Sequence, residues 1–135
     1  MPDHDKAMLA YAQLADLSQQ KKQLVGRDKL LILAGAAACR AGFPDVAERC
    51  RALVLSNNPA HMVGKTATFA DALRSQNFAL FLKQLERFCT YERAEHLLHE
   101  LGIDLNSTDD APPKSSGKRA LDSLSADHWS EAGPR

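Results

Sequence analysis

The sequence feature that most constrains the fold is an apolar run in the first third of the chain. From about Lys29 to Ala41 almost every residue is apolar, namely Leu30, Leu31, Ile32, Leu33, Ala34, Ala36, Ala37, Ala38 and Cys39. Asp28 precedes the run as a favourable N-cap and Gly42 follows it as a stop signal, so the run is predicted to be a helix. A helix without a polar face must be covered on all sides, and we therefore expect it in the middle of the domain.

The segments on either side also show helical periodicity. The clearest stripe follows the spacing i, i+3, i+4, i+7 and consists of Phe78, Phe81, Leu82, Leu85, Phe88 and Cys89. We expect further helices over about residues 5–24 (ended by Gly26), 44–56, 69–74 (opened by Thr68 and Asp71) and 91–101 (opened by Thr90). No run alternates between apolar and polar residues with period two, which is the signal of a strand. The predicted fold is therefore an all-α bundle of five to six helices.

Composition changes abruptly near residue 106. Only seven of the thirty residues from 106 to 135 are apolar, too few to offset the entropy lost on ordering. The sequence predicts an all-helical domain over 4–105 and a flexible, disordered tail over 106–135. The tail contains Trp129, the only tryptophan of the chain. This residue is either a docking element that folds on a partner or onto the protein's own apolar groove, or an incidental apolar residue of an unstructured end.

Charge and cysteine usage exclude several classes of function. Seventeen basic residues balance seventeen acidic ones, so no broad field of one sign recruits nucleic acid or an anionic membrane. No apolar run approaches the roughly 20 residues that span a bilayer, and the N-terminal residues lack the features of a secretory signal. The three cysteines form no C-x-x-C pair. We expect a cytoplasmic protein without a membrane partner.

Residues 28–59 resemble one tetratricopeptide unit, a helix-turn-helix of 34 residues that ends in a proline. With Pro59 as that proline, the positions that match are Leu31, Ala34, Gly35, Gly42 and Ala47. Arg51 departs from the pattern, because the family places an apolar side chain there, and no second copy follows at a 34-residue offset. Generic antiparallel packing of two helices accounts for the same positions.

The resemblance implies protein binding along the inner face of the first helix of the unit. The candidate partner-binding residues are Lys29, Ile32, Ala36 and Cys39, to which Trp129 is added from the tail. Because this face is largely apolar, it must be covered by the segment 5–24, by a second subunit or by an apolar helix of a partner. We therefore expect a non-catalytic protein-interaction or scaffold domain that binds a protein partner or itself.

Two alternatives remain open. Glu92, His96 and His99 share one side of a predicted helix, which suggests a small metal-dependent or redox activity, although a solvated helix flank explains the same pattern. A basic ridge for nucleic acid is suggested by Arg40, Arg49 and Arg51, which are followed by Lys65, Arg74, Lys83, Arg87 and Arg93, but acidic residues interleave with it. The sequence indicates no catalytic residue, no bound metal or other cofactor and no small-molecule ligand.

Overall fold

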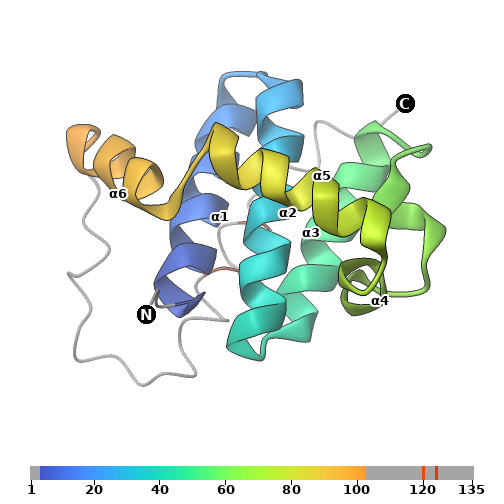
Figure 1. The fold of residues 1–135 in the computed structure, drawn as a ribbon. Coiled ribbons are helices and arrows are strands. Elements are labelled where there is room, and N and C mark those ends of the chain that lie inside the picture. Colours follow the sequence, from blue (N-terminus) through green and yellow to red (C-terminus); the bar gives the residue numbers. More distant parts are fainter. Residues whose placement is uncertain (1–3, 103–119, 121–123, 125–135) are drawn as a thin grey trace.

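The computed structural model describes residues 4–102 together with Ala120 and Leu124. Its elements are α1 (His4–Gln20), α2 (Leu24–Ala41), α3 (Pro44–Asn57), the 3-10 helix η1 (Met62–Lys65), α4 (Phe69–Leu73), α5 (Gln76–Phe88) and α6 (Tyr91–Glu100), as Figure 1 shows. The described part of the chain contains no strand, and the predicted all-α class is confirmed.

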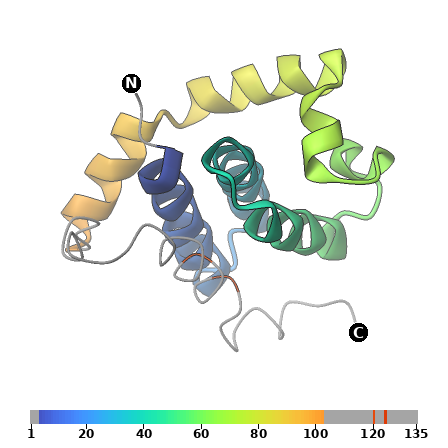
Figure 2. The same ribbon diagram turned by 90° about the horizontal axis from the view of Figure 1, so that it is seen from below.

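Helices α1, α2 and α3 form one layer with α2 in the middle. Helix α2 packs against α1 on one side and against α3 on the other. Helix α5 runs across this layer, and α6 lies against α1 beyond it (Figure 1, Figure 2). Every residue from 30 to 38 is buried, so the helix without a polar face occupies the central place expected for it.

Most helix ends follow the local signals of the sequence. Gly42 terminates α2 in the left-handed region, with φ of 88°, and Pro44 begins α3. The Thr68 hydroxyl accepts a hydrogen bond from the Asp71 amide at 3.1 Å, and the Thr90 hydroxyl accepts one from the Arg93 amide at 3.2 Å. These two caps open α4 and α6, which confirms both predicted starts.

The beginning of α2 differs from the prediction. Helix α1 ends at Gln20, and the chain reverses at Lys22, which has φ of 59°, while the Gln23 amide donates to the Ser18 carbonyl at 2.9 Å. Helix α2 then begins at Leu24, so that Gly26 lies inside it rather than ending the previous helix. Asp28 is therefore not an N-cap; its carboxylate pairs instead with Arg27 at 2.7 Å.

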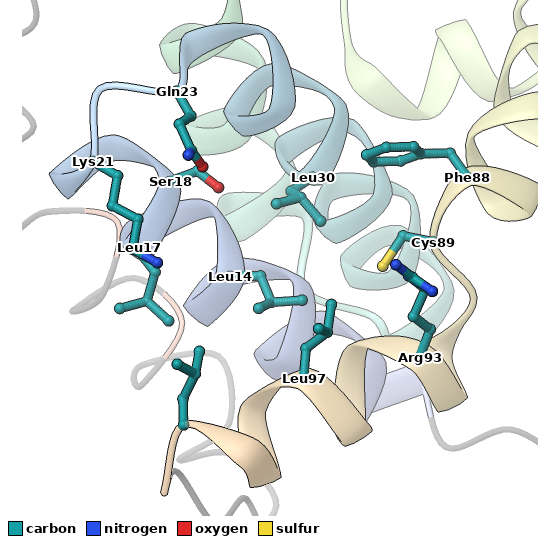
Figure 3. A pocket seen from close by; sticks show the side chains of 11 residues that line it. Leu14, Leu17, Ser18, Lys21, Gln23, Leu30, Phe88, Cys89, Arg93 and Leu97 are labelled. Carbon is teal, nitrogen blue, oxygen red and sulfur yellow. The ribbon is translucent and has the colours of Figure 1, made fainter.

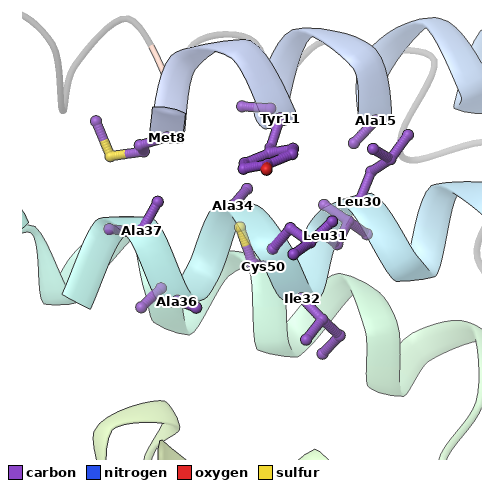
Figure 4. Close-up of a cluster of buried hydrophobic side chains, with 14 of the residues drawn as sticks. Met8, Tyr11, Ala15, Leu30, Leu31, Ile32, Ala34, Ala36, Ala37 and Cys50 are labelled. Atoms are coloured by element: carbon purple, nitrogen blue, oxygen red, sulfur yellow. The ribbon is translucent and has the colours of Figure 1, made fainter. Parts of the chain in front are cut away.

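The layer packs closely because α2 presents small residues to α1. Figure 4 shows Met8 and Tyr11 of α1 directed toward the α2 residues Ala34 and Ala37, which are buried. An alanine side chain keeps the helix backbones close, and the longer side chains of α1 fill the remaining space.

The other side of α2 is covered by α4 and α5. The ring of fully buried Phe69 in α4 lies directly over Gly35, where an added Cβ would stand 2.7 Å from the Phe69 Cζ atom. Phe69 also packs edge-on against Phe78 of α5, with 5.8 Å between the ring centroids. The chain therefore supplies its own apolar cover for this side of its central helix.

Two positions of the C-terminal thirty residues are described, and both belong to the core. Ala120 and Leu124 are helical and fully buried. The Arg49 side chain donates from Nε and Nη2 to the Leu124 carbonyl at 3.1 and 2.9 Å. At these two positions the chain packs against the domain. Trp129 and the other residues of that tail lie outside the described residues, as do residues 103–105.

Candidate functional site

The four partner-binding positions predicted on α2 do not form an open groove. Ile32 and Ala36 are fully buried, and Figure 4 shows both directed away from α1. That side of α2 faces α4 and α5, so the cover that the sequence required comes from the chain itself. Both side chains are buried by the chain itself, although Ala36 lies at the wall of an opening between α1, α2 and α5, and their contact with a partner stays a prediction.

The other two positions keep some exposure. Cys39 is half-buried, and Lys29 places its Nζ atom 4.7 Å from the centroid of the Phe88 ring. This distance is that of a cation–π contact between α2 and the end of α5. Trp129, the fifth predicted position, lies outside the described residues.

An apolar opening that bears on binding lies between α6 and the α1–α2 pair. We call it the α1–α6 cavity. It has a volume of about 320 Å³. Figure 3 shows its lining side chains, which are Leu14, Leu17, Ser18, Lys21, Gln23, Leu30, Phe88, Cys89, Arg93, Leu97 and Leu101. A cavity of this size, mainly apolar with a few polar groups, is typical of binding sites.

Two helical stripes form the walls of this cavity. Leu14, Leu17 and Lys21 follow each other at i, i+3, i+7 along α1. On α6, Arg93 and Leu97 follow at i, i+4, and Leu101 comes four residues later, just beyond the helix. Residues at these spacings share one face of a helix, so each wall is continuous.

A buried hydrogen bond fixes the position of α6 relative to α1. The Tyr11 hydroxyl donates to the Cys89 carbonyl at 2.8 Å, which ties α1 to the α5–α6 junction. Burial raises the pKa of the Tyr11 phenol, so the group stays protonated and keeps donating at neutral pH. From that junction, Ala94 and Leu98 of α6 are fully buried, while Leu97 is left at the cavity wall.

The charged side chains that line the cavity are both cations. Lys21 stands on the α1 side and Arg93 on the α6 side, with Leu14 and Leu97 between them in Figure 3. Among the described residues that line the cavity there is no carboxylate. The rim also carries apolar surface, because Phe88 and Leu101 are about half exposed. The site therefore joins an apolar floor to positive charge on two sides.

Sequence reasoning missed this cavity although its signal was present. The stripe of Leu14, Leu17 and Lys21 and the stripe of Arg93, Leu97 and Leu101 are both readable in the sequence. What the sequence does not give is that α6 packs against α1, which brings together residues about eighty positions apart.

Two other openings differ from this cavity, one in being more polar and one in being less enclosed. One of about 270 Å³ lies between α1, α2 and α5, and Arg40 and Glu86 face each other across it with 3.6 Å between their charged atoms. Another, of about 370 Å³, lies over Asp28, Asn57 and His61 and is the more open of the two.

The three cysteines are free thiols without activation. Burial raises the pKa of the thiols of Cys39, Cys50 and Cys89, which keeps them protonated at neutral pH. The nearby Arg93 charge acts in the opposite direction on Cys89, and burial dominates. A reactive cysteine needs a lowered pKa, so these thiols give no support to nucleophilic or redox chemistry.

The histidine cluster of the metal alternative is engaged on the surface. His96 Nε2 lies 2.9 Å from a Glu100 carboxylate oxygen, and both side chains are well exposed. Within the described residues, no group of three or more His, Cys, Asp or Glu side chains is arranged to hold a metal ion.

The arginines of the nucleic-acid alternative make contacts within the chain. Arg40 pairs with Glu86, and Arg49 donates to the Leu124 carbonyl. Arg51 donates to the carbonyls of Val63 and Thr66 at 3.2 and 2.7 Å. Arg51 is the residue that departs from the tetratricopeptide pattern, and its polar side chain holds η1 and the following residues against α3.

Comparison with profiles of known protein families, with curated proteins and with solved structures finds no match to this chain. No helix in the described part of the chain is both long enough and apolar enough to cross a bilayer.

Proposed function

We propose that this protein is a non-catalytic interaction module whose α1–α6 cavity receives an apolar segment of a protein partner. The observation that carries the proposal is the cavity itself, which has an apolar floor and an open mouth between α6 and the α1–α2 pair. The side chains of Phe88 and Leu101 extend this apolar surface to the rim. Exposed apolar side chains around a hollow are characteristic of an anchor site for a partner.

Other features support an interaction role. The cysteine thiols are not activated and the polar groups near the cavity form no acid–base pair, so the site supplies binding rather than chemistry. The resemblance of residues 28–59 to a tetratricopeptide unit stays a prediction and points to the same class of function. As part of the proposal we place the protein in the cytoplasm, because all three of its cysteines are free thiols.

The test compares two leucine substitutions in the full-length chain. Leu101 lines the cavity and is 53% exposed, whereas Leu80 is 55% exposed on α5 and does not line it. Leu101→Glu places a charge at the apolar rim, and Leu80→Glu makes the same change at equal exposure elsewhere. Each variant and the unmodified protein is used for cross-linking and affinity capture from a lysate of the source organism, with light scattering of the purified proteins.

We expect the unmodified protein and Leu80→Glu to recover the same partners and Leu101→Glu to lose them. If light scattering shows a dimer that only Leu101→Glu dissociates, the partner is a second copy of the chain. Equal recovery by all three proteins would contradict the proposal, because binding would then not involve the cavity. Thermal unfolding followed by circular dichroism verifies that both variants are folded.

A further inference from the structure

The charges of the α1–α6 cavity identify the chemistry of its occupant. Resting on the function proposed above, we infer that the partner segment is an amphipathic helix with an apolar anchor flanked by Asp or Glu side chains. The juxtaposition that carries the inference is Lys21 on the α1 wall and Arg93 on the α6 wall, with leucines between them.

Neither cation has a competing anion in the described part of the chain. Lys21 and Arg93 form no ion pair there, whereas the exposed Arg40 and Arg74 are paired with Glu86 and Asp71. A carboxylate of a partner therefore gains a new ion pair without breaking an existing one. Both side chains are exposed, so such pairs orient the partner and depend on salt.

A third cation lies beside one wall of the cavity, although its side chain lines the neighbouring opening over Asp28, Asn57 and His61. Lys29 lies over the Phe88 ring at 4.7 Å, and Phe88 is itself a wall of the cavity. The whole chain has no net charge, so the field that an acidic partner meets is local to this site. Its range is about the Debye length, ~10 Å at 0.1 M salt, and binding is expected to depend on salt.

The shape of the site favours a helix over an extended strand. The described residues form no strand whose edge an extended peptide could join. The cavity is instead an opening between helices with leucines at helical spacing on both walls. A partner helix lays apolar side chains at i, i+3, i+4 into such an opening, and its flanking positions then face the two cations.

The experiment selects peptides rather than relying on a known partner. A displayed library of helical peptides, with randomised residues at and around a central apolar stripe, is panned against three forms of the full-length protein. These are the unmodified protein, the double variant Lys21→Glu/Arg93→Glu, and the control Lys83→Glu/Arg87→Glu. The control reverses two exposed cations of α5 that do not line the cavity, so both variants have the same net charge.

We expect the unmodified protein and the control to select peptides enriched in Asp and Glu beside the apolar stripe. The cavity variant is expected to select Lys and Arg there instead. A synthetic peptide from the first selection, measured by fluorescence anisotropy, should bind the cavity variant at least about tenfold more weakly and the control within about twofold. The affinity for the unmodified protein should fall as salt is raised.

Failure of the inference is distinguishable from failure of the proposed function. Peptides without acidic enrichment that still lose binding in Leu101→Glu overturn the inference and leave the interaction role intact. Peptides that bind Leu101→Glu as well as the unmodified protein overturn both. A dimer dissociated by Leu101→Glu, with no peptide selected, identifies a second copy as the occupant and also overturns the inference.

Discussion

The ring of Phe69 occupies the space that a side chain at position 35 would need. An added Cβ at Gly35 would lie 2.7 Å from Cζ and 2.9 Å from Cδ2 of that ring, closer than carbon atoms pack in proteins. Phe69 is fully buried and is the first residue of the five-residue helix α4. The missing side chain at Gly35 therefore determines how α4 docks on α2.

The first prediction concerns this contact. Gly35→Ala should lower the free energy of unfolding by about 1 to 3 kcal/mol, because the ring of Phe69 must move out of a packed core. This loss outweighs the gain of up to about 1 kcal/mol that alanine brings to a helix interior. Urea denaturation followed by circular dichroism measures the difference.

Gly26 provides the matched control for that prediction. It lies in the same helix, has no heavy atom within 4 Å of an added Cβ, and does not have a positive φ. Gly26→Ala should leave stability unchanged or raise it by up to about 1 kcal/mol. Equal effects of the two substitutions would show that close contact with Phe69 is not what position 35 requires.

The second prediction concerns Arg27, which is only 1% exposed and joins three helices. Its guanidinium donates to Gln19 Oε1 at 2.7 Å, to Asp28 Oδ1 at 2.7 Å and to the Leu53 carbonyl at 3.3 Å. Arg27→Ala should lower the free energy of unfolding by about 3 to 5 kcal/mol, since it leaves the buried hydrogen-bond acceptors without a donor. Arg27→Lys should also lower the free energy of unfolding, because an ammonium group lacks the fork geometry of the guanidinium, but by less than Arg27→Ala does.

An exposed arginine tests whether burial is the cause. Arg74 also forms an ion pair, at 3.6 Å from Asp71, but its side chain is 82% exposed. Arg74→Ala is expected to change the free energy of unfolding by less than about 1 kcal/mol. A similar loss for Arg27→Ala and Arg74→Ala in chemical denaturation would contradict the role assigned to Arg27.

Short-range signals explain which parts of this fold are predictable. The starts of α3, α4 and α6 depend on Pro44, Thr68 and Thr90, whose effects extend over only three or four residues. Such ends are therefore readable from the sequence. Ser75 stands in the N-cap position of α5 but makes no side-chain cap hydrogen bond.

The features that the sequence did not reveal depend on distant contacts. The chain reverses at Lys22 in a conformation that favours glycine, although the glycine of this segment, Gly26, lies four residues later. Arg27, next to that glycine, donates hydrogen bonds to the Gln19 side chain and the Leu53 carbonyl. The α1–α6 cavity depends on the bond from Tyr11 to the Cys89 carbonyl. At Lys22, tertiary contacts overrode a local preference. At the α1–α6 cavity, they created a surface that no single segment contains.

The third prediction is a pH dependence caused by His61. Its Nδ1 accepts a hydrogen bond from the Val63 amide at 3.0 Å and so caps η1, and burial lowers its pKa from the ordinary 6.5. Below pH 6.5 the unfolded chain binds a proton at this position that the folded chain does not bind. The stability contributed by neutral His61 is therefore present above pH 6.5 and is lost as the pH falls toward the lowered pKa.

His61→Asn separates this titration from the cap. The asparagine carbonyl oxygen accepts the same bond from Val63 without titrating. The difference in unfolding free energy between the two proteins, measured between pH 8 and 5 at about half-unit steps, should be flat above pH 7 and should shift in favour of the variant below pH 6.5. A constant difference over the whole range would rule out His61 as the source.

The fourth prediction concerns Leu124, which the structure places in the core although it lies far beyond α6 in a polar stretch of sequence. Leu124 is fully buried, and Arg49 of α3 donates two hydrogen bonds to its carbonyl. Leu124→Ala should lower the free energy of unfolding by about 2 to 4 kcal/mol, as expected for a buried leucine. Leu80→Ala, at an exposed position, should cost less than about 0.5 kcal/mol.

A double-mutant cycle shows whether the two residues act together. Arg49→Ala removes the donor and should cost about 1 to 2 kcal/mol on its own, because the buried carbonyl loses its partner. If Leu124 docks only while Arg49 holds its carbonyl, the double variant costs less than the sum of the single variants. Additive losses would mean that the leucine packs independently of the arginine. No loss at all for Leu124→Ala would place this residue outside the cooperative unit, because a leucine that leaves no cavity on truncation is not part of the packed core.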